Sequence, residues 1–250
     1  MAMPVLFEDL ENNLLRALKP GDWAVLQPHL EDWSASSGTL IHEPGDTVRH
    51  AYFPRAASLL SYFVDLSDGQ GIETVLVGRE GAIGGIVSQG RLPAFARASV
   101  QVGGSFWRID LAELEEAKSQ SPSLSHLFAR YADCLLAQIF QSVACNAAHS
   151  IEQRTAKWLL AAMDRTGKHD LTLTQEQLAA MLGVGRSYLS RVFRELRDDG
   201  IIETRRGRII VHKTGRLRSI ACECNAAVSR HFDDVLKGVY PNGQKNGEQH

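Results

Sequence analysis

Residues 171–200 read LTLTQEQLAAMLGVGRSYLSRVFRELRDDG, and the second half of this stretch places four arginines within twelve residues. When residues 186–197 are drawn as a helix, the arginines and two serines fall within about 140° of one another. The opposite side holds Tyr188, Leu189, Val192, Phe193 and Leu196. This pattern predicts a helix with one buried apolar face and one exposed cationic face.

A second helix is predicted directly before this one. Thr174 and Gln177 have the spacing of a capping box, in which the first and fourth residues exchange hydrogen bonds. Gly183 suits the left-handed conformation that ends a helix. Two helices joined by a short turn containing glycine form a helix-turn-helix. The alternative, a helical hairpin with a solvated basic face, does not account for the agreement of cap, glycine and arginine face.

A helix of this width fits the major groove of DNA, where arginine bonds the O6 and N7 atoms of guanine. In a helix-turn-helix, the first residues of the second helix meet the edges of the bases. We therefore expect Arg186, Ser187 and Arg191 to read bases. Ser190 and Arg194 lie further along the helix and are expected to contact bases or phosphates.

The residues after this helix add more positive charge. Residues 200–213, GIIETRRGRIIVHK, predict a β-hairpin wing that turns at Arg206-Gly207, with Arg205, Arg206 and Arg208 at its tip. Residues 165–218 hold 12 Lys and Arg against 6 Asp and Glu, whereas the rest of the chain holds 15 against 23. This asymmetry is typical of a phosphate-binding module on an acidic body. Taken alone, the wing arginines have a second interpretation, as solvated arginines of a turn.

The bulk properties exclude several classes of protein. The 250 residues suit one large or two modest domains, and the net charge of −2 indicates neither nucleic acid nor membrane. The acidic start does not resemble a secretory signal, and no apolar run approaches the ~18 residues of a spanning helix. The four cysteines do not form a small disulfide framework. We therefore expect a cytoplasmic protein without a membrane partner.

The N-terminal half has a different sequence pattern. Residues 38–110 consist of short β-rich runs separated by turn signals, which predicts an antiparallel β-roll. Residues 123–149 form a long, largely apolar helix, which is typical of a dimerisation helix; the alternative is a helix buried within its own domain. Its seam, the expected dimer interface, consists of Leu124, Leu127, Phe128, Tyr131, Leu135 and Ile139.

These observations predict an α+β fold: an N-terminal antiparallel β-roll of the double-stranded β-helix or jelly-roll type, a long dimerisation helix and a C-terminal winged helix-turn-helix. Ser150 and Gln153 form a second capping box, so residues 145–150 are the expected hinge. The expected domains are the β-roll with its N-terminal helices (1–120), the dimerisation helix and hinge (121–149), the DNA-binding domain (150–238) and a disordered tail (239–250).

This arrangement, with its helix-turn-helix stretch, resembles the Crp/Fnr superfamily of bacterial transcription regulators. The resemblance implies a homodimer that reads a two-fold symmetric operator in double-stranded DNA, with RNA polymerase as a candidate partner. The family reads bases through Arg, Glu and a second Arg. Here these positions are Arg186, Ser187 and Arg191, so the operator is expected to differ from the family's best-known half-site. Thr174 matches a phosphate-contacting position.

The resemblance does not extend to a cyclic-nucleotide site. Gly85 stands where nucleotide-binding members carry the ribose-binding Glu, and neither Arg91 nor Arg97 is followed by the Ser or Thr of the family motif. The base-contacting Thr-Ser pair becomes Ile139-Phe140. We expect no cyclic AMP and no other cofactor. Any other effector is expected near Arg79, Gly84, Gly85, Arg97, Tyr131 and Cys134, although turn glycines and solvated arginines are the simpler interpretation.

The cysteines do not match an Fnr-type iron–sulfur arrangement, which needs clustered cysteines near the N-terminus. Cys134 and Cys145 lie about 16 Å apart along one helix and cannot share a metal. Cys222 and Cys224 form a weak C-x-C pair. Each cysteine is expected to be a small buried hydrophobe, and no metal site is predicted. A regulator that responds to redox state through these cysteines, or to a non-nucleotide effector, stays open as the alternative.

An enzyme is not expected. The sequence lacks the G-x-S-x-G, G-x-x-x-x-G-K-[ST] and H-E-x-x-H motifs, and no catalytic residue is predicted. A third hypothesis is a protein-interaction module whose helix-turn-helix no longer reads DNA. The complete arginine face favours a DNA-binding regulator instead.

Overall fold

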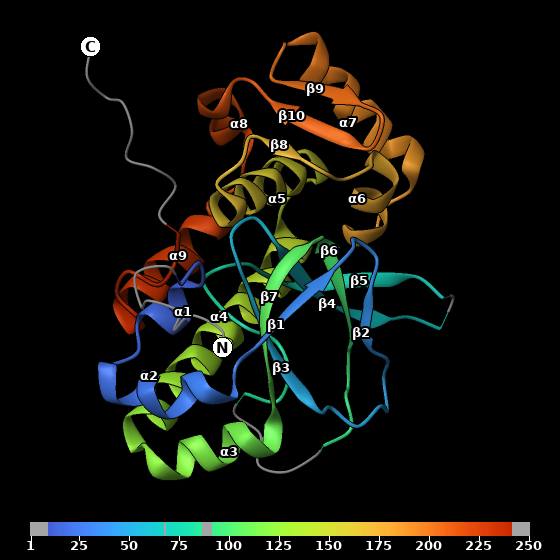
Figure 1. Ribbon diagram of the computed structural model, residues 1–250. Coiled ribbons are helices and arrows are strands. Elements are labelled where there is room, and N and C mark those ends of the chain that lie inside the picture. The colour runs from blue at the N-terminus through green and yellow to red at the C-terminus, as the bar shows by residue number, and fades with distance from the viewer. Residues whose placement is uncertain (1–9, 68, 87–91, 242–250) are drawn as a thin grey trace, which may run out of the picture.

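The computed structural model describes residues 10–67, 69–86 and 92–241 of the chain (Figure 1). The N-terminal segment holds two short helices and one 3-10 turn, α1 (Asn13–Arg16), α2 (Pro20–Leu26) and η2 (Gln27–His29). The strands of the N-terminal half then follow: β1 (Glu31–Ala35), β2 (Leu40–His42), β3 (His50–Pro54), β4 (Leu59–Asp65), β5 (Gly71–Val77), β6 (Arg97–Val102) and β7 (Gly104–Asp110).

These strands form two antiparallel sheets, which confirms the predicted β-roll. One sheet has the strand order β1–β7–β3 and the other the order β2–β6–β4–β5. Apolar residues from both sheets pack between them in one cluster that includes Tyr52, Leu60 and Phe106. Residues 43–46 form one of the tight turns between strands: the Asp46 N–H donates to the Glu43 carbonyl at 3.1 Å, and the Glu43 N–H donates to the Asp46 carboxylate at 2.9 Å.

Two helices cover the β-roll after β7: α3 (Leu111–Gln120) and α4 (Pro122–Ala148). Asp110 caps α3, because its carboxylate accepts the Ala112 N–H at 2.8 Å. Ser121 caps α4, and Pro122 occupies the first turn, where its missing N–H costs nothing. The 27-residue α4 connects the β-roll with the C-terminal half.

Most of the predicted dimer seam of α4 is buried inside the chain itself. Leu124, Phe128 and Tyr131 are at most 1% exposed and pack with the β-roll and the N-terminal helices in one core cluster. Leu127 and Leu135 are partly buried against the same cluster. The assignment to a dimer interface is therefore wrong for Leu124, Phe128 and Tyr131, because this side of α4 packs on the core of its own chain. Of the predicted seam, Ile139 is exposed.

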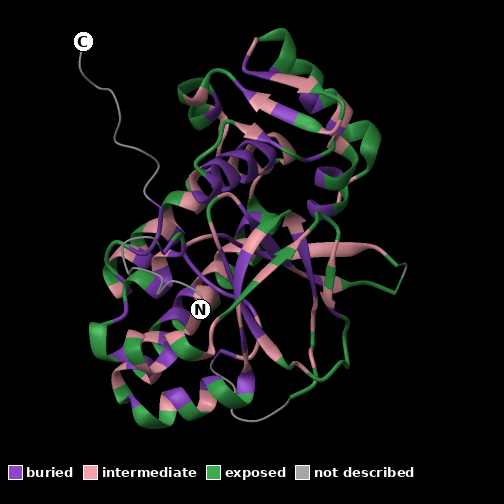
Figure 2. Cartoon of the chain, viewed as in Figure 1, coloured by how far each residue is buried: buried purple, intermediate pink, exposed green. Residues whose placement is uncertain are grey.

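Helix α5 (Ile151–Thr166) begins the C-terminal half with the predicted capping box. The Ser150 hydroxyl accepts the Gln153 N–H at 3.3 Å, and the Gln153 amide oxygen accepts the Ser150 N–H at 3.0 Å. Figure 2 shows α5 as the buried centre of this half. Around it lie β8 (Asp170–Leu171), α6 (Gln175–Met181), α7 (Arg186–Asp198), β9 (Ile202–Arg205), β10 (Arg208–Val211) and α8 (Thr214–Ile220), with the strand order β8–β10–β9.

The last helix, α9 (Cys224–Val235), leaves the winged domain and packs beside α4 (Figure 1). Phe232 joins the core cluster that holds Tyr131, and Val239 and Tyr240 are buried in the same cluster. The expected boundaries are therefore wrong here: α9 belongs to the body of the protein, and residues 239–241 are buried rather than disordered. The rest of the predicted tail, residues 242–250, lies outside the described residues.

The two halves share one core. Leu59, Phe63 and Leu76 of the β-roll pack in the same cluster as apolar residues of α5, α6 and α7. The winged domain is thus seated on β4 and β5 as well as joined to α4. Within the described part of the chain, no helix has the combination of length and apolar character needed to cross a membrane.

Candidate nucleic-acid interface

Helices α6 and α7 form the predicted helix-turn-helix. The Thr174 hydroxyl accepts the Gln177 N–H at 3.1 Å, and the Gln177 amide oxygen accepts the Thr174 N–H at 2.8 Å, so the capping box is confirmed. Gly183 ends the first helix with a φ of +67°. A side chain there would meet Ile72 of β5, with 2.5 Å between an added Cβ and the Ile72 Cδ1. Glycine is therefore favoured by its left-handed conformation, and a larger residue would also displace the end of the Ile72 side chain.

The two faces of α7 separate as the sequence predicts. Leu189, Val192, Phe193 and Leu196 are buried in the domain core. The opposite face is exposed and carries Arg186, Ser187, Arg191 and Arg194. The cationic face of α7 is therefore unobstructed, and a helix exposed in this way fits into the major groove of DNA.

Tyr188 departs from this pattern. It was expected on the buried face, but it is 37% exposed and its hydroxyl donates to the Glu152 carboxylate at 3.1 Å. The guanidinium of Arg191 lies 4.7 Å from the centre of the Tyr188 ring. Tyr188 lies at the edge of the apolar arc, where a polar tip reaches solvent while the ring supports Arg191.

Ser190 is half-buried and already has a partner, since its hydroxyl accepts a hydrogen bond from the Gln175 side chain at 2.8 Å. This bond joins α6 to α7 and orients both helices. Arg186 approaches Glu176 at 3.8 Å, but both side chains are largely exposed, so this ion pair is weak. Among the described residues, Arg194 forms no ion pair. The predicted DNA-reading face of α7 therefore has Arg186, Arg191 and Arg194 as its exposed cations.

The wing also forms where it is predicted. Arg205 pairs with Arg208 in register across β9 and β10, so Arg206 and Gly207 make the two-residue loop, with Gly207 at a φ of +72°. Arg206 is exposed at the tip. Arg208 is an ion-pair partner of Asp170 on β8, and Arg205 pairs with Glu203 at 2.6 Å. Arg206 is thus the wing cation most available to a phosphate.

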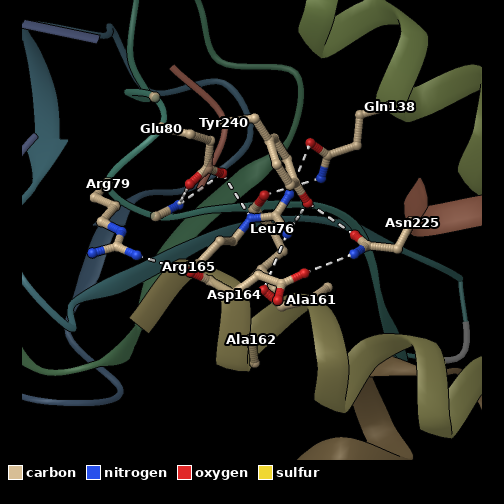
Figure 3. A network of polar contacts seen from close by, with 12 residues as sticks. Leu76, Arg79, Glu80, Gln138, Ala161, Ala162, Asp164, Arg165, Asn225 and Tyr240 are labelled. Atoms are coloured by element: carbon tan, nitrogen blue, oxygen red, sulfur yellow. Dashed lines mark hydrogen bonds and ion pairs between the residues drawn. The ribbon is translucent and has the colours of Figure 1, made fainter. Parts of the chain in front are cut away.

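A buried ion pair joins the winged domain to the β-roll (Figure 3). Arg165 on α5 donates to the Glu80 carboxylate at 2.7 Å, and both side chains are only 2% exposed. Arg165 also donates to the Tyr240 hydroxyl at 2.8 Å, and the Gly78 N–H donates to Glu80 at 3.1 Å. Such a pair is stable only when these further hydrogen bonds satisfy both groups. The sequence showed no sign of it, because its members are 75 to 85 residues apart.

Glu73 on β5 makes a second polar contact between the halves. Its carboxylate accepts the Trp158 indole N–H at 2.6 Å and the Ser61 hydroxyl at 3.0 Å. Burial raises the pKa of Glu73 to about 7, although both hydrogen bonds and the nearby Lys157 oppose the rise. The attachment of the winged domain to the β-roll therefore includes a group that titrates near neutral pH.

The β-roll contains a cavity of about 410 Å³ with a mostly apolar lining. Gly84 and Gly85 line it as predicted, and Ile139 reaches it from α4. Gly84 has a φ of +100°, and a side chain there would collide with the His50 carbonyl, so this glycine shapes the cavity wall. The described lining residues include neither Lys nor Arg; Arg91 lies outside the described residues. An uncharged apolar molecule suits this lining better than a phosphate does.

The other four predicted effector residues do not line this cavity. Arg79 donates to the Asp164 carbonyl at 3.2 Å, between the two halves. Arg97 pairs with Asp65 at 3.0 Å. Tyr131 donates to the Ala82 carbonyl at 2.9 Å, and Cys134 is fully buried in the core. The prediction is wrong for these residues, because each already has a structural role elsewhere.

Comparison with known proteins identifies the C-terminal half most directly. Residues 153–220 match the Crp-like helix-turn-helix domain family. The stretch includes most of α5 together with α6, α7, the wing and α8, which are the elements that position the cationic face. No curated protein compared by sequence shows a significant match.

Solved structures share the fold of the larger part of the chain. FixK2 from Bradyrhizobium japonicum is 18% identical, with a TM-score of 0.65 over 77% of this chain and 98% of that one. The c-di-GMP responsive global regulator CLP from Xanthomonas campestris is 15% identical, with a TM-score of 0.63 over 78% and 99%. A Crp-family transcriptional regulator from Thermus thermophilus is 18% identical, with a TM-score of 0.64 over 76% and 96%. At these identities the likeness is one of fold.

Proposed function

We propose that the chain, which carries a Crp-like helix-turn-helix domain, is a transcription regulator of the Crp/Fnr superfamily. We further propose that it binds a two-fold symmetric DNA site as a homodimer. The observation that carries this proposal is the exposed cationic face of α7. Arg186, Arg191 and Arg194 point away from the core, while the apolar side of the same helix anchors it to the domain. The wing adds Arg206 to this basic surface.

Dimerisation is supported by an apolar patch on α4. Leu136, Ile139, Phe140 and Val143 are exposed and follow one another at helical spacing, with Phe140 64% exposed. Residues at these intervals lie on one face of a helix, so the patch is continuous. We propose that this α4 patch (Leu136, Ile139, Phe140 and Val143) packs against its copy across a two-fold axis, which is the usual symmetry of a homodimer.

Selection of bound fragments from a random DNA pool tests the proposed reading of DNA. We expect an enriched motif with two inverted half-sites about one helical turn apart. A protein that makes about 6–10 phosphate contacts loses about 10³- to 10⁵-fold in affinity between about 50 and 200 mM salt, and we expect a loss of this order. A pool without any enriched motif would instead favour an interaction module.

The effector class follows from the cavity in the β-roll. We propose a small apolar ligand rather than a cyclic nucleotide, because the described lining is apolar and Gly85 stands in place of the ribose-binding carboxylate. Calorimetric titration with cyclic AMP should show no heat of binding. Native mass spectrometry of the purified protein should show a retained apolar molecule, and Ala96→Phe, at a residue that lines the cavity, should lower its retention.

A further inference from the structure

Three cysteines and one histidine converge where α4 meets α9. Cys145 lies in the last turn of α4, His149 follows the same helix, and Cys222 and Cys224 lie at the start of α9. The sulfurs of Cys145 and Cys222 are 3.6 Å apart, and the Cys224 sulfur is 3.4 Å from the His149 Nδ1. All four donor atoms lie within 4.8 Å of one another.

We propose that these four residues form a tetrahedral Cys3His site for one zinc ion. Zinc binds thiolate sulfur at about 2.3 Å and imidazole nitrogen at about 2.0–2.1 Å, so tetrahedral ligands are separated by about 3.8 Å between sulfurs and about 3.6 Å between sulfur and nitrogen. The two short separations in the cluster differ from these values by only a few tenths of an ångström. Small side-chain rotations are enough to seat the ion.

The surroundings of the cluster are those of a zinc site. His149 directs its second ring nitrogen toward the Glu223 carboxylate at 3.7 Å, and a carboxylate in this position orients a zinc-binding histidine. The Gln141 side chain donates to the Cys224 sulfur at 3.1 Å. Cys145, Cys222 and Cys224 are all buried. Cys224 also lines a crevice together with Gln141 and Arg154, so one ligand of the cluster is next to a hollow at the surface of α4 and α5.

Nearby cations offset the charge of the proposed site. On binding zinc, the three thiols release three protons to water, so three thiolates, one neutral imidazole and Zn²⁺ carry a net charge of −1. Arg154 interacts electrostatically with Cys145 and Cys222, and Lys157 with Cys145. These two cations of α5 compensate the remaining negative charge.

Two other uses of the cluster fit less well. A disulfide between Cys145 and Cys222 needs an S–S distance of about 2.05 Å and leaves Cys224 and His149 without a purpose. An iron–sulfur cluster places several iron and sulfide ions between its cysteines and needs donors spread more widely than 4.8 Å. A single ion uses all four side chains.

The position of the site gives it a consequence for DNA binding, which rests on the proposed function. His149 lies just before α5, and Cys222 closely follows α8, so the zinc ion ties both chain connections of the winged domain to the end of α4. Metal occupancy therefore restrains the placement of α7 relative to the body. Removal of zinc is expected to lower affinity for the selected DNA motif.

The test uses the full chain purified under reducing conditions. We expect one zinc per chain by elemental analysis. Cobalt(II) in its place should give the intense visible bands of a tetrahedral site together with thiolate charge transfer. Cys145→Ser and Cys222→Ser should each lower zinc affinity at least tenfold. Cys134→Ser is the matched control, because Cys134 is equally buried on α4 but lies outside the cluster, and it should leave metal binding unchanged.

A variant that keeps all four ligands separates loss of zinc binding from misfolding. Glu223 is largely exposed, so Glu223→Gln should fold normally and weaken zinc binding about 10- to 100-fold through His149. Absence of stoichiometric zinc after incubation with zinc salt, octahedral cobalt spectra, stoichiometric iron with sulfide or a Cys145–Cys222 disulfide under reducing conditions would each overturn the proposal. Arg186→Ala should keep its zinc, so failure to bind DNA and failure to bind metal are separable.

Discussion

Arg186 is a single exposed side chain that is expected to contribute to both the affinity and the sequence preference of DNA binding. It lies in the first turn of α7, and its ion pair with Glu176 is weak. Arg186→Ala should lower affinity for the selected site by about 1–3 kcal/mol and relax the preference at one base pair, because a bidentate contact to guanine is lost. Binding to variant sites in a fluorescence assay measures both effects.

Arg206→Ala is the matched control, since Arg206 is also exposed but lies on the wing. It should weaken binding equally for all sequences and reduce the slope of log affinity against log salt by about one. If Arg186→Ala behaves in the same way, Arg186 is a phosphate contact and base reading lies elsewhere on α7.

A second single residue, Glu73, makes the stability of the protein depend on pH. Its pKa rises from 4.5 to about 7 in the folded protein, so between these values the folded state holds a proton that the unfolded state has released. The stability contributed by Glu73 is therefore complete below about pH 4.5 and is lost as the pH rises through about 7. Urea denaturation of wild type and Glu73→Gln at several pH values should show this loss only in the wild type.

The comparison between the two proteins isolates Glu73 from other titrating groups. In Glu73→Gln the amide oxygen can accept the Trp158 indole N–H while the amide NH2 donates to the Ser61 hydroxyl, so both contacts and the fold should be retained. A wild type that gains stability relative to the variant as the pH rises over the same range would contradict the assignment.

Helix α4 has different roles along its length. Its N-terminal part is covered by the β-roll, α3 and α9, whereas the α4 patch near its C-terminal part is exposed. Phe140→Glu should shift the monomer–dimer equilibrium at least tenfold toward monomer, because a charge would be buried at the two-fold axis without a partner. Sedimentation equilibrium measures this shift.

Leu66→Glu is the control for this prediction, since Leu66 is also an exposed large hydrophobe but lies on the β-roll, far from the patch in sequence. It should leave the dimer intact. A dimer of unchanged affinity in Phe140→Glu would place the interface away from the α4 patch.

At the scale of the whole molecule, the seating of the winged domain on the β-roll depends on the Arg165–Glu80 pair. Glu80→Gln should cost about 3–5 kcal/mol of unfolding free energy, because it leaves the buried Arg165 charge unpaired. Glu203→Gln removes an exposed ion pair with Arg205 and should cost much less than the buried change. Urea denaturation compares the two variants. Equal losses would show that the buried pair is not what holds the halves together.

Local patterns were sufficient to predict much of the architecture. The helix-turn-helix, both capping boxes, the wing turn at Arg206-Gly207 and the individual strands of the β-roll depend on residues that are close together in sequence, and each is present. The cationic face of α7 was predictable for the same reason, since helical periodicity alone separates arginines from core residues. Tyr188 was misassigned only because it lies at the edge of that periodicity.

Contacts between residues that are far apart in sequence could be identified only from the tertiary structure. The β-roll, the N-terminal helices and α9 bury most of the predicted seam, and no local pattern shows which side of an apolar helix its own chain covers. The Arg165–Glu80 pair and the cluster of Cys145, His149, Cys222 and Cys224 join residues about 75 to 85 positions apart. Sequence periodicity reports which residues share a face, whereas the packing of one face on another is determined by shape and burial over the whole chain.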